Sequence, residues 1–402
     1  MNRIENITIV QCLDQGVQAD VHLLEDAAVV WQEDTIVWVG KTKEMPEQYE
    51  QSNIVFQNGG FLVPGLIDCH THLAFGGWRA DEFGERVSGT PYAEITKRGG
   101  GISSTVAETR AASKEDLIEK ANGFLTEMAA LGVTTVECKS GYGLNIEDEL
   151  KILSVYEDLK KITPLTLVST FLGAHLVPKE TPRANYCRMI IEEMIPKIAK
   201  QKLAEFCDIF IDDHAFSQAE ARPIVEAAKA HGLKIKLHVD QLSGDGGAEF
   251  AADCGAFSAD HLEYVSEGIK ALKKSGTIAV TLPLASLYTF QKSLDARRLI
   301  DEGVEVALAT DFNPGSAPSN HLPLAMMLGC TLNRMSPNET LKAVTLYAAK
   351  ALDKADKIGS IEVGKRADFA LIDTPSIEHW MYHFKANANC LTVKNGRIIY
   401  QQ

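Results

Sequence analysis

The stretch FLVPGLIDCHTHLAF, residues 61–75, decides the fold, because an apolar run leads directly into a pair of histidines. Such a run is typical of a buried strand. His70 and His72 are two residues apart, and side chains at that spacing on a strand face the same side. Both imidazoles can therefore point toward one ion, although an isolated pair of this kind also arises by chance.

Seven more apolar, β-rich segments follow, and helical patterns lie between most of them. The clearest helix is expected to begin after Ser113, a capping residue with Asp116 three positions later. Eight strands that alternate with helices predict an α/β fold, a parallel (β/α)8 TIM-like barrel. The rival fold is an open doubly wound sheet, but no GxGxxG or Walker A pattern is present. The seven segments are residues 132–140, 165–175, 205–213, 233–241, 256–264, 277–285 and 304–315.

The two ends of the chain differ from its middle, because they show only short β-like stretches. Near the C-terminus, Asn395-Gly396 is typical of a two-residue hairpin turn. Neither end alone is long enough for a secure core. We therefore expect residues 1–63 and 352–402 to form one small β-sandwich domain beside a barrel of residues 64–351.

Composition narrows the class of protein. The chain has 402 residues, 45% of them apolar and 23% charged, with a formal net charge of −14. This composition excludes disorder as the main state, and the acidic balance argues against nucleic-acid or anionic-membrane partners. No apolar run is long enough to span a membrane, and the start MNRIENITIV lacks a signal-peptide core. The eight scattered cysteines contain no CxxC pair, so we expect reduced thiols and a cytoplasmic protein.

Other ionisable side chains are expected at the same rim of the barrel as the histidine pair. His238 ends the fifth expected strand, His261 lies on the sixth, and Asp311 ends the eighth. The carboxyl ends of barrel strands are where barrel enzymes place their active sites. Imidazole and carboxylate ligands suit Zn²⁺, with iron as a second choice. Three histidines and one aspartate leave a coordination position for water, which a bound metal makes nucleophilic.

These residues resemble the signature of the amidohydrolase superfamily. Residues 64–72 read PGLIDxHxH, and residues 359–368 read GSIEVGKxAD. Longer motifs are similar to one group within that superfamily, the imidazolonepropionase family. They are FGGWRADEF at 75–83, RGGGISSTV at 98–106, KSGYGL at 139–144, TFLGAH at 170–175, ADHLEYV at 259–265 and TDFNPGSAPS at 310–319.

The resemblance implies a reaction, a cofactor and an assembly. The reaction is hydrolysis of the ring amide of 4-imidazolone-5-propanoate to N-formimino-L-glutamate, the third step of histidine degradation. The family implies one divalent or trivalent metal per chain, Zn or Fe, held by His70, His72, His238 and Asp311. Two-metal relatives carry a lysine at the end of the fourth strand, where this chain has IDDH at residues 211–214, so one metal is expected. The family also implies a homodimer.

Ring opening needs groups that move protons beside the activated water. His261 and Asp311 are expected to move them, and Asp311 can take the proton of the water. Gln241 stands three residues after His238, where many related enzymes carry glutamate, and its amide can hydrogen-bond the ring as a catalytic-site group. Arg79 offers a bidentate fork for the propanoate carboxylate. The resemblance implies that Tyr142 and His175 also contact the substrate. Tyr92, on the loop before the glycine run, is a further candidate, and Asn313, Gly315 and Ser316 follow Asp311, where side-chain and backbone groups can hold the ligand.

Two other classes of function stay open. One is another mononuclear amidohydrolase or aminohydrolase that acts on a cyclic amide or an amino-heterocycle. Gln241 disfavours deamination of the usual kind, and Arg79 favours a substrate with a carboxylate. The other is a metal-containing barrel that serves as a binding or scaffold protein, and the complete set of expected ligands argues against it.

Overall fold

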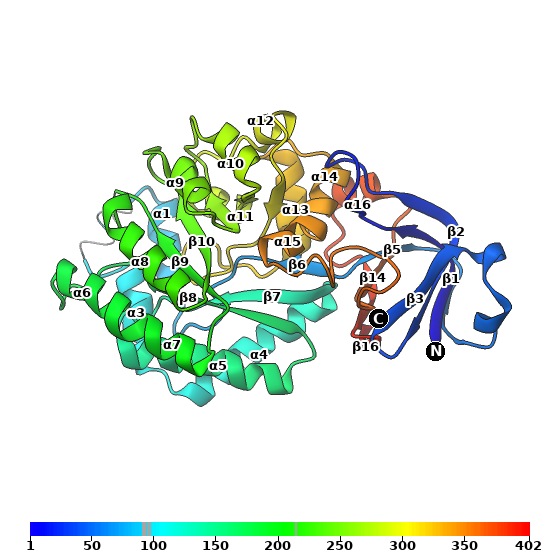
Figure 1. Cartoon of the computed structure of the whole chain (residues 1–402), viewed down its shortest axis with the longest axis horizontal. Helices are drawn as coiled ribbons and strands as arrows, with labels where there is room; N and C mark the ends of the chain where they lie inside the picture. The colour runs from blue at the N-terminus through cyan, green and yellow to red at the C-terminus, as the bar shows by residue number, and fades with distance from the viewer. Residues whose placement is uncertain (91–93, 95–97, 214) are drawn as a thin grey trace.

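Two sheets make up the fold in the computed structural model, which describes residues 1–90, 94, 98–213 and 215–402 (Figure 1). One is a barrel of eight parallel strands that follow one another in chain order. Its two edges meet at a parallel bridge between Thr71 and Phe312. The expected barrel is confirmed, and each expected segment contains one strand of the barrel. The strands are β6 (Leu66–Asp68), β7 (Val133–Lys139), β8 (Thr166–Ala174), β9 (Phe206–Phe210), β10 (Lys234–Val239), β11 (Ser258–His261), β12 (Ile278–Thr281) and β13 (Val306–Leu308).

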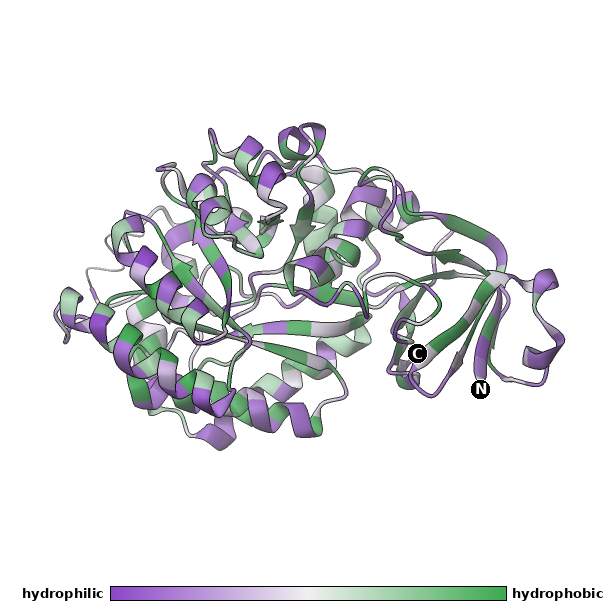
Figure 2. Cartoon of the chain, in the orientation of Figure 1, coloured by the Kyte–Doolittle hydropathy of each residue, from purple (hydrophilic) through white to green (hydrophobic). Residues whose placement is uncertain are grey.

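Helices surround this barrel, and Figure 2 shows apolar colour on its strands and mixed colour on the outer helices. The helix expected after Ser113 is α4 (Lys114–Ala130), and the Ser113 hydroxyl accepts a hydrogen bond from the Asp116 N–H. Among the described residues, no helix combines the length and apolar character needed to cross a membrane. The other helices are α1 (Ala80–Val87), α3 (Ile102–Ala111), α5 (Ile146–Ile162), α6 (Arg183–Met189), α7 (Ile195–Gln201), α8 (Gln218–Ala230), α9 (Gly247–Asp253), α10 (Ile269–Ser275), α11 (Pro283–Thr289), α12 (Ala296–Asp301), α13 (Leu322–Thr331), α14 (Pro337–Ala343), α15 (Leu346–Ala351) and α16 (Ile377–His383).

The second sheet is built from both ends of the chain, and both termini lie on it (Figure 1). It curls back on itself, because the ring centroid of Trp31 lies 5.6 Å from that of Phe369 although two strands separate theirs in the sheet. The hairpin turn at Asn395-Gly396 is confirmed, with both residues at positive φ. The strands are β1 (Asn2–Val10), β2 (Leu23–Gln32), β3 (Thr35–Lys41), β4 (Asn53–Gln57), β5 (Phe61–Pro64), β14 (Phe369–Ile372), β15 (Asn389–Lys394) and β16 (Arg397–Gln401).

Gly65 is the point at which the chain leaves this sheet and enters the barrel. The segment at residues 61–75 was expected to carry one strand, but it carries two, β5 in the curled sheet and β6 in the barrel. A Cβ atom on Gly65 would lie 2.3 Å from Cγ2 of Thr134, so only glycine fits where β6 passes β7. This junction fixes the histidines that follow β6 relative to the barrel. The domain division between residues 63 and 64 stays a prediction.

Candidate active site

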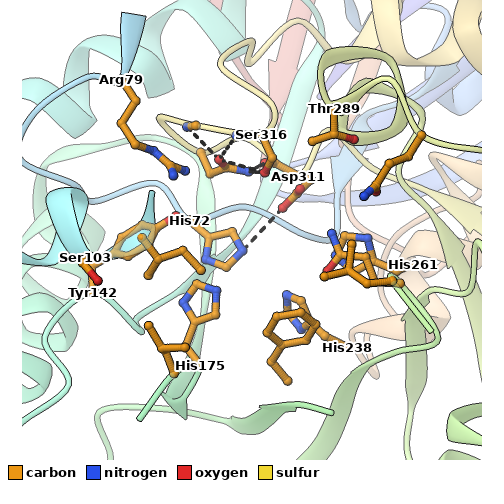
Figure 3. Close-up of a pocket in the computed structure, with 18 of the residues that line it drawn as sticks. His72, Arg79, Ser103, Tyr142, His175, His238, His261, Thr289, Asp311 and Ser316 are labelled. Carbon is orange, nitrogen blue, oxygen red and sulfur yellow. Dashed lines mark hydrogen bonds and ion pairs between the residues drawn. The ribbon is translucent and has the colours of Figure 1, made fainter. Parts of the chain in front are cut away.

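The residues expected at the site gather around one cavity of about 450 Å³ at the carboxyl ends of the barrel strands (Figure 3). His72 follows β6, His238 lies in β10 and His261 ends β11. Tyr92 lies outside the described residues, so its predicted substrate contact is not tested. The predicted residues that line the cavity are His72, Arg79, Tyr142, His175, His238, Gln241, His261, Asp311, Asn313, Gly315 and Ser316.

Backbone hydrogen bonds between the first and last strands bring the histidine pair to Asp311. The Asp311 N–H donates to the carbonyl of His70 at 3.1 Å, and the His72 N–H donates to the carbonyl of Phe312 at 2.8 Å. Asp311 and His261 adopt left-handed backbone conformations, with φ of 56° and 82°. Such conformations cost about 1–3 kcal/mol each in non-glycine residues and are concentrated at functional sites.

Three imidazoles and one carboxylate crowd together at the cavity floor. Nε2 of His70 and Nε2 of His72 each lie 3.4 Å from Oδ1 of Asp311. One potential ligand atom from each of His70, His72 and His238 falls within a mutual distance of 4.8 Å. The same holds for His70, His261 and Asp311. The two groups share His70, and the first consists of three of the four predicted ligands.

The chemistry of these atoms fits a metal ion. Nε2 of His70 and Nε2 of His238 are buried and have no hydrogen-bond partner among the described residues. Burial, together with the charge of Lys139, lowers the pKa of His70 to about 3, so its ring is neutral and carries a lone pair. Contacts with His70 and His72 hold the pKa of Asp311 well below its usual value, although burial opposes this. Neutral imidazoles and an ionised carboxylate are the forms that bind Zn²⁺ or iron.

A carboxylate stands behind two of the ligand rings. Oδ2 of Asp260 lies 2.7 Å from Nδ1 of His70, and Oδ2 of Asp208 lies 3.0 Å from Nδ1 of His238. The hydrogen bond from Nδ1 of His70 to Asp260 holds the proton on that nitrogen and leaves Nε2 free to bind a metal, whereas Asp208 lies close to Nδ1 of His238 without hydrogen-bond geometry. Both aspartates are fully buried.

His261 faces the cavity with a carboxylate of its own. Its Nδ1 lies 3.5 Å from Oε1 of Glu263, which also accepts a hydrogen bond from the Ser286 hydroxyl at 3.4 Å. Burial alone would lower the pKa of His261, but the Glu263 carboxylate raises it above its usual value. His261 can therefore carry a proton within the cavity.

A second wall of the cavity is built from the turn after β7 and the end of β8. The buried carboxylate of Glu149 accepts hydrogen bonds from the backbone N–H groups of Gly141, Gly143 and Leu144, which fixes the turn that carries Tyr142. The carbonyl of Gly141 lies 3.0 Å from Nδ1 of His175. The ring of His175 stacks on His72 with centroids 5.2 Å apart.

Arg79 lies against the loop that follows Asp311. A Cβ atom on Gly315 would fall 1.4 Å from a terminal nitrogen of Arg79, so glycine is required where the guanidinium crosses the loop. Asn313 shapes this loop, because its side-chain oxygen accepts hydrogen bonds from the N–H groups of Gly315 and Ser316. Arg79 is 8% exposed, and its nearest carboxylate, Glu82, is 3.8 Å away. A buried guanidinium with one distant ion pair is suited to an anionic group in the cavity.

Several residues of the site were not predicted. Arg86 lines the cavity and donates to the carbonyl of Gly315 at 2.9 Å. Its position seven residues after Arg79 gives the same helix face and is a signal that the sequence offered. Asp208 and Asp260 interrupt apolar strands, which is the corresponding signal for buried partners of ligands. Ser103, Thr289 and Gln291 also line the cavity, and nothing in their sequence context distinguishes them from loop or helix-end residues.

Comparison with known sequences identifies the relatives of the chain. The model of the amidohydrolase family matches residues 61–399. An imidazolonepropionase of Fusobacterium nucleatum is 46% identical over 378 residues, which covers 93% of this chain and 91% of that protein. An imidazolonepropionase of a Geobacillus species is 46% identical over 388 residues, with coverage of 94% and 91%.

Comparison with solved structures shows the same fold. A zinc-bound adenosine deaminase from Xanthomonas campestris matches with a TM-score of 0.74 at 18% identity, covering all of this chain and 93% of its own. A 5-methylcytosine deaminase from Klebsiella pneumoniae matches with a TM-score of 0.75 at 16% identity, covering all of this chain and 97% of its own. At such identities the likeness concerns the fold alone. By its sequence, the chain belongs to the amidohydrolase family, and within it to the imidazolonepropionases.

Proposed function

We propose that the chain hydrolyses the ring amide of 4-imidazolone-5-propanoate to N-formimino-L-glutamate, a step of histidine degradation. The observation that carries this proposal is a single cavity that joins a cluster of metal-ligating side chains to a buried guanidinium (Figure 3). The substrate has the two matching parts, a cyclic amide to be opened and a carboxylate to be held. The 46% identity to imidazolonepropionases supports the same assignment.

His70, His72, His238 and Asp311 would hold one Zn or Fe ion. When bound, such an ion acts as a Lewis acid that makes a water molecule nucleophilic near neutral pH and polarises a carbonyl. The buried, unpartnered Nε2 atoms of His70 and His238 support this ligand set. Both metals accept these ligands, so metal analysis of the purified protein decides between them.

The side chains of the cavity divide the remaining work. Asp311, whose carboxylate is ionised, accepts the proton of the attacking water. His261, whose protonated form is favoured by Glu263, donates a proton to the ring nitrogen that leaves. Gln241 lines the cavity beside them and binds the ring through its amide. This assignment moves protons without a glutamate at position 241.

Arg79 binds the propanoate carboxylate, and Gly315 keeps the space in which its guanidinium lies. Asn313 and Ser316 hold the loop around the bound substrate. Tyr142 and His175 form the opposite wall of the substrate site. Tyr92 is kept as a predicted contact.

The eight cysteines are unpaired, which supports a reducing, cytoplasmic compartment.

A coupled assay tests the proposal. 4-Imidazolone-5-propanoate is made freshly from urocanate with urocanase, the metal-loaded protein is added, and loss of ultraviolet absorbance is followed while the product is identified. We expect formiminoglutamate from the wild type and from His231→Ala, a control at an exposed histidine, but not from His238→Ala. Folded wild-type protein with one equivalent of metal and no turnover would overturn the assignment.

A further inference from the structure

A fully buried lysine lies directly beneath the predicted ligands. Lys139 is the last residue of β7, and no part of its side chain is exposed. Its Nζ donates to Oδ2 of Asp208 at 2.7 Å and to Oε1 of Glu137 at 2.9 Å, and lies 3.7 Å from Oδ2 of Asp260. Asp208 and Glu137 keep the pKa of Lys139 above its usual value although burial opposes this, so the amine is charged.

Each of the three carboxylates contacts a different predicted ligand or the backbone beside one. Oδ2 of Asp208, the atom that accepts from Lys139, also lies 3.0 Å from Nδ1 of His238. Oδ2 of Asp260 accepts a hydrogen bond from Nδ1 of His70 at 2.7 Å. Oε2 of Glu137 accepts a hydrogen bond from the N–H of Thr71, the residue between His70 and His72, at 3.3 Å. The ammonium group of Lys139 is therefore linked, through one carboxylate each, to His238, to His70 and to the backbone between His70 and His72.

A carboxylate that shares its oxygen between a lysine and an imidazole has little freedom to rotate. Such a carboxylate orients the imidazole that it faces, so that Nδ1 points toward the carboxylate and Nε2 points into the site. Removal of the ammonium leaves three buried carboxylates near one another without the cation that hydrogen-bonds two of them and pairs with the third. None of them would then hold its histidine or backbone N–H in the same place.

We propose that Lys139 is a positioning residue that aligns His70, His72 and His238 for metal binding by holding Asp260, Glu137 and Asp208. This inference rests on the metal centre of the proposed function. Lys139 is not among the described residues that line the cavity or form the groups of candidate metal ligands. It acts through the three carboxylates, from the end of a strand that supplies none of the predicted ligands.

Lys236 provides a matched control. It is also fully buried, and its Nζ lies at the same 3.7 Å from Oδ2 of Asp260. Its Nζ donates a hydrogen bond to the carbonyl of Cys69 at 3.3 Å. Lys236→Met removes the same charge from the same depth, but it leaves the contacts of Asp208 and Glu137 in place. A role in charge balance alone would make the two lysines equivalent.

The test measures Co²⁺ and Zn²⁺ binding to metal-free wild type, Lys139→Met and Lys236→Met, using competition with a coloured chelator and the visible spectrum of the Co²⁺ protein. Near-ultraviolet circular dichroism of the metal-free proteins reports folding. For Lys139→Met we expect a roughly 10–100-fold loss of metal affinity and an altered Co²⁺ spectrum, the range found when partners of ligands are removed. For Lys236→Met we expect a smaller loss and a spectrum closer to that of wild type. Wild-type affinity and spectrum in folded Lys139→Met, or equal losses in both variants, would overturn the inference.

A second variant keeps the test decisive if Lys139→Met does not fold. The double variant Glu137→Gln/Lys139→Met removes one negative and one positive charge together, and the glutamine oxygen can still accept from the Thr71 N–H. We expect the same loss of metal affinity as in Lys139→Met. Recovery of wild-type affinity would show that Lys139 only balances the charge of the carboxylates. Failure of wild-type protein itself to bind either metal would overturn the proposed function instead, so the two failures are distinguishable.

Discussion

The interior of the barrel beneath the cavity and the core of the curled sheet are built from opposite kinds of side chain. The core of the sheet consists of apolar residues such as Ile9, Trp31 and Phe369. The barrel interior holds Asp208 and Lys139 with no exposure at all, together with other charged groups. Burial of apolar area stabilises a fold, whereas burial of charges costs free energy unless every charge has partners. The core of the curled sheet thus stabilises the fold, whereas the charged groups in the barrel interior beneath the cavity cost free energy of folding and serve the site.

The largest expected effect on activity is at the rim. Asp311→Asn removes the group that accepts a proton, so kcat should fall about 10²–10⁴-fold. Asparagine has nearly the same shape and tolerates the φ of 56° found here, but it loses the charge that His70 and His72 favour, so the melting temperature should fall only slightly. The coupled assay and calorimetry measure the two quantities, with Asp301→Asn on the surface as control. A large fall in melting temperature would show that the rim also supports the fold.

The opposite outcome is expected in the sheet. Phe369→Ala removes a buried ring that packs on Trp31, and should lower the free energy of unfolding by about 3–5 kcal/mol. The activity per folded molecule should not change, because the sheet contributes no side chain to the cavity lining. Denaturant unfolding and the coupled assay below the melting temperature test this, with exposed Tyr382→Ala as control. An altered KM would mean that the two regions are energetically coupled.

A smaller effect is expected from the guanidinium. Arg79→Met should reduce kcat/KM roughly 10–150-fold, the equivalent of about 1.5–3 kcal/mol for hydrogen bonds to a charged group. The fall should appear mainly as a higher KM, because the carboxylate is remote from the amide that reacts. Exposed Arg188→Met serves as control. An unchanged KM would exclude Arg79 from carboxylate binding.

The smallest effect is expected at Glu149. Burial raises the pKa of this carboxyl, while backbone N–H groups oppose the shift. Glu149→Gln keeps an oxygen that accepts from the turn around Tyr142, so we expect a change of about 1 kcal/mol in stability and a modest rise in KM. Exposed Glu147→Gln on the same helix is the comparison. A loss of several kcal/mol in the free energy of unfolding would show that the charge of Glu149, and not only its hydrogen bonds to the turn, stabilises the fold.

The sequence predicted what depends on spacing along one strand. Two features placed the candidate side chains at the same rim of the barrel. One is the two-residue spacing of His70 and His72, and the other is the position of His238, His261 and Asp311 at the ends of expected strands. The barrel itself followed from the alternation of apolar segments with helical patterns.

What the sequence could not predict depends on contacts between strands. The partners of Asp208 and Asp260 are set by which residues of neighbouring strands face the barrel interior. The contact of Trp31 with Phe369 depends on how tightly the second sheet curls, and no local pattern encodes that curvature. The division of one apolar segment at Gly65 required knowledge of Thr134 on the adjacent strand.

The position of the two termini has a practical consequence. Both lie on the curled sheet, and in Figure 1 that sheet is at one end of the molecule, whereas α1 and α3, which carry residues of the cavity lining, lie in the barrel part away from it. A tag, a fused enzyme or a solid support attached at either terminus would be joined to the curled sheet, which contributes no residue to the cavity lining. The chain is therefore suited to being tethered next to an enzyme that delivers its substrate, with the attachment on the part of the fold that does not line the site.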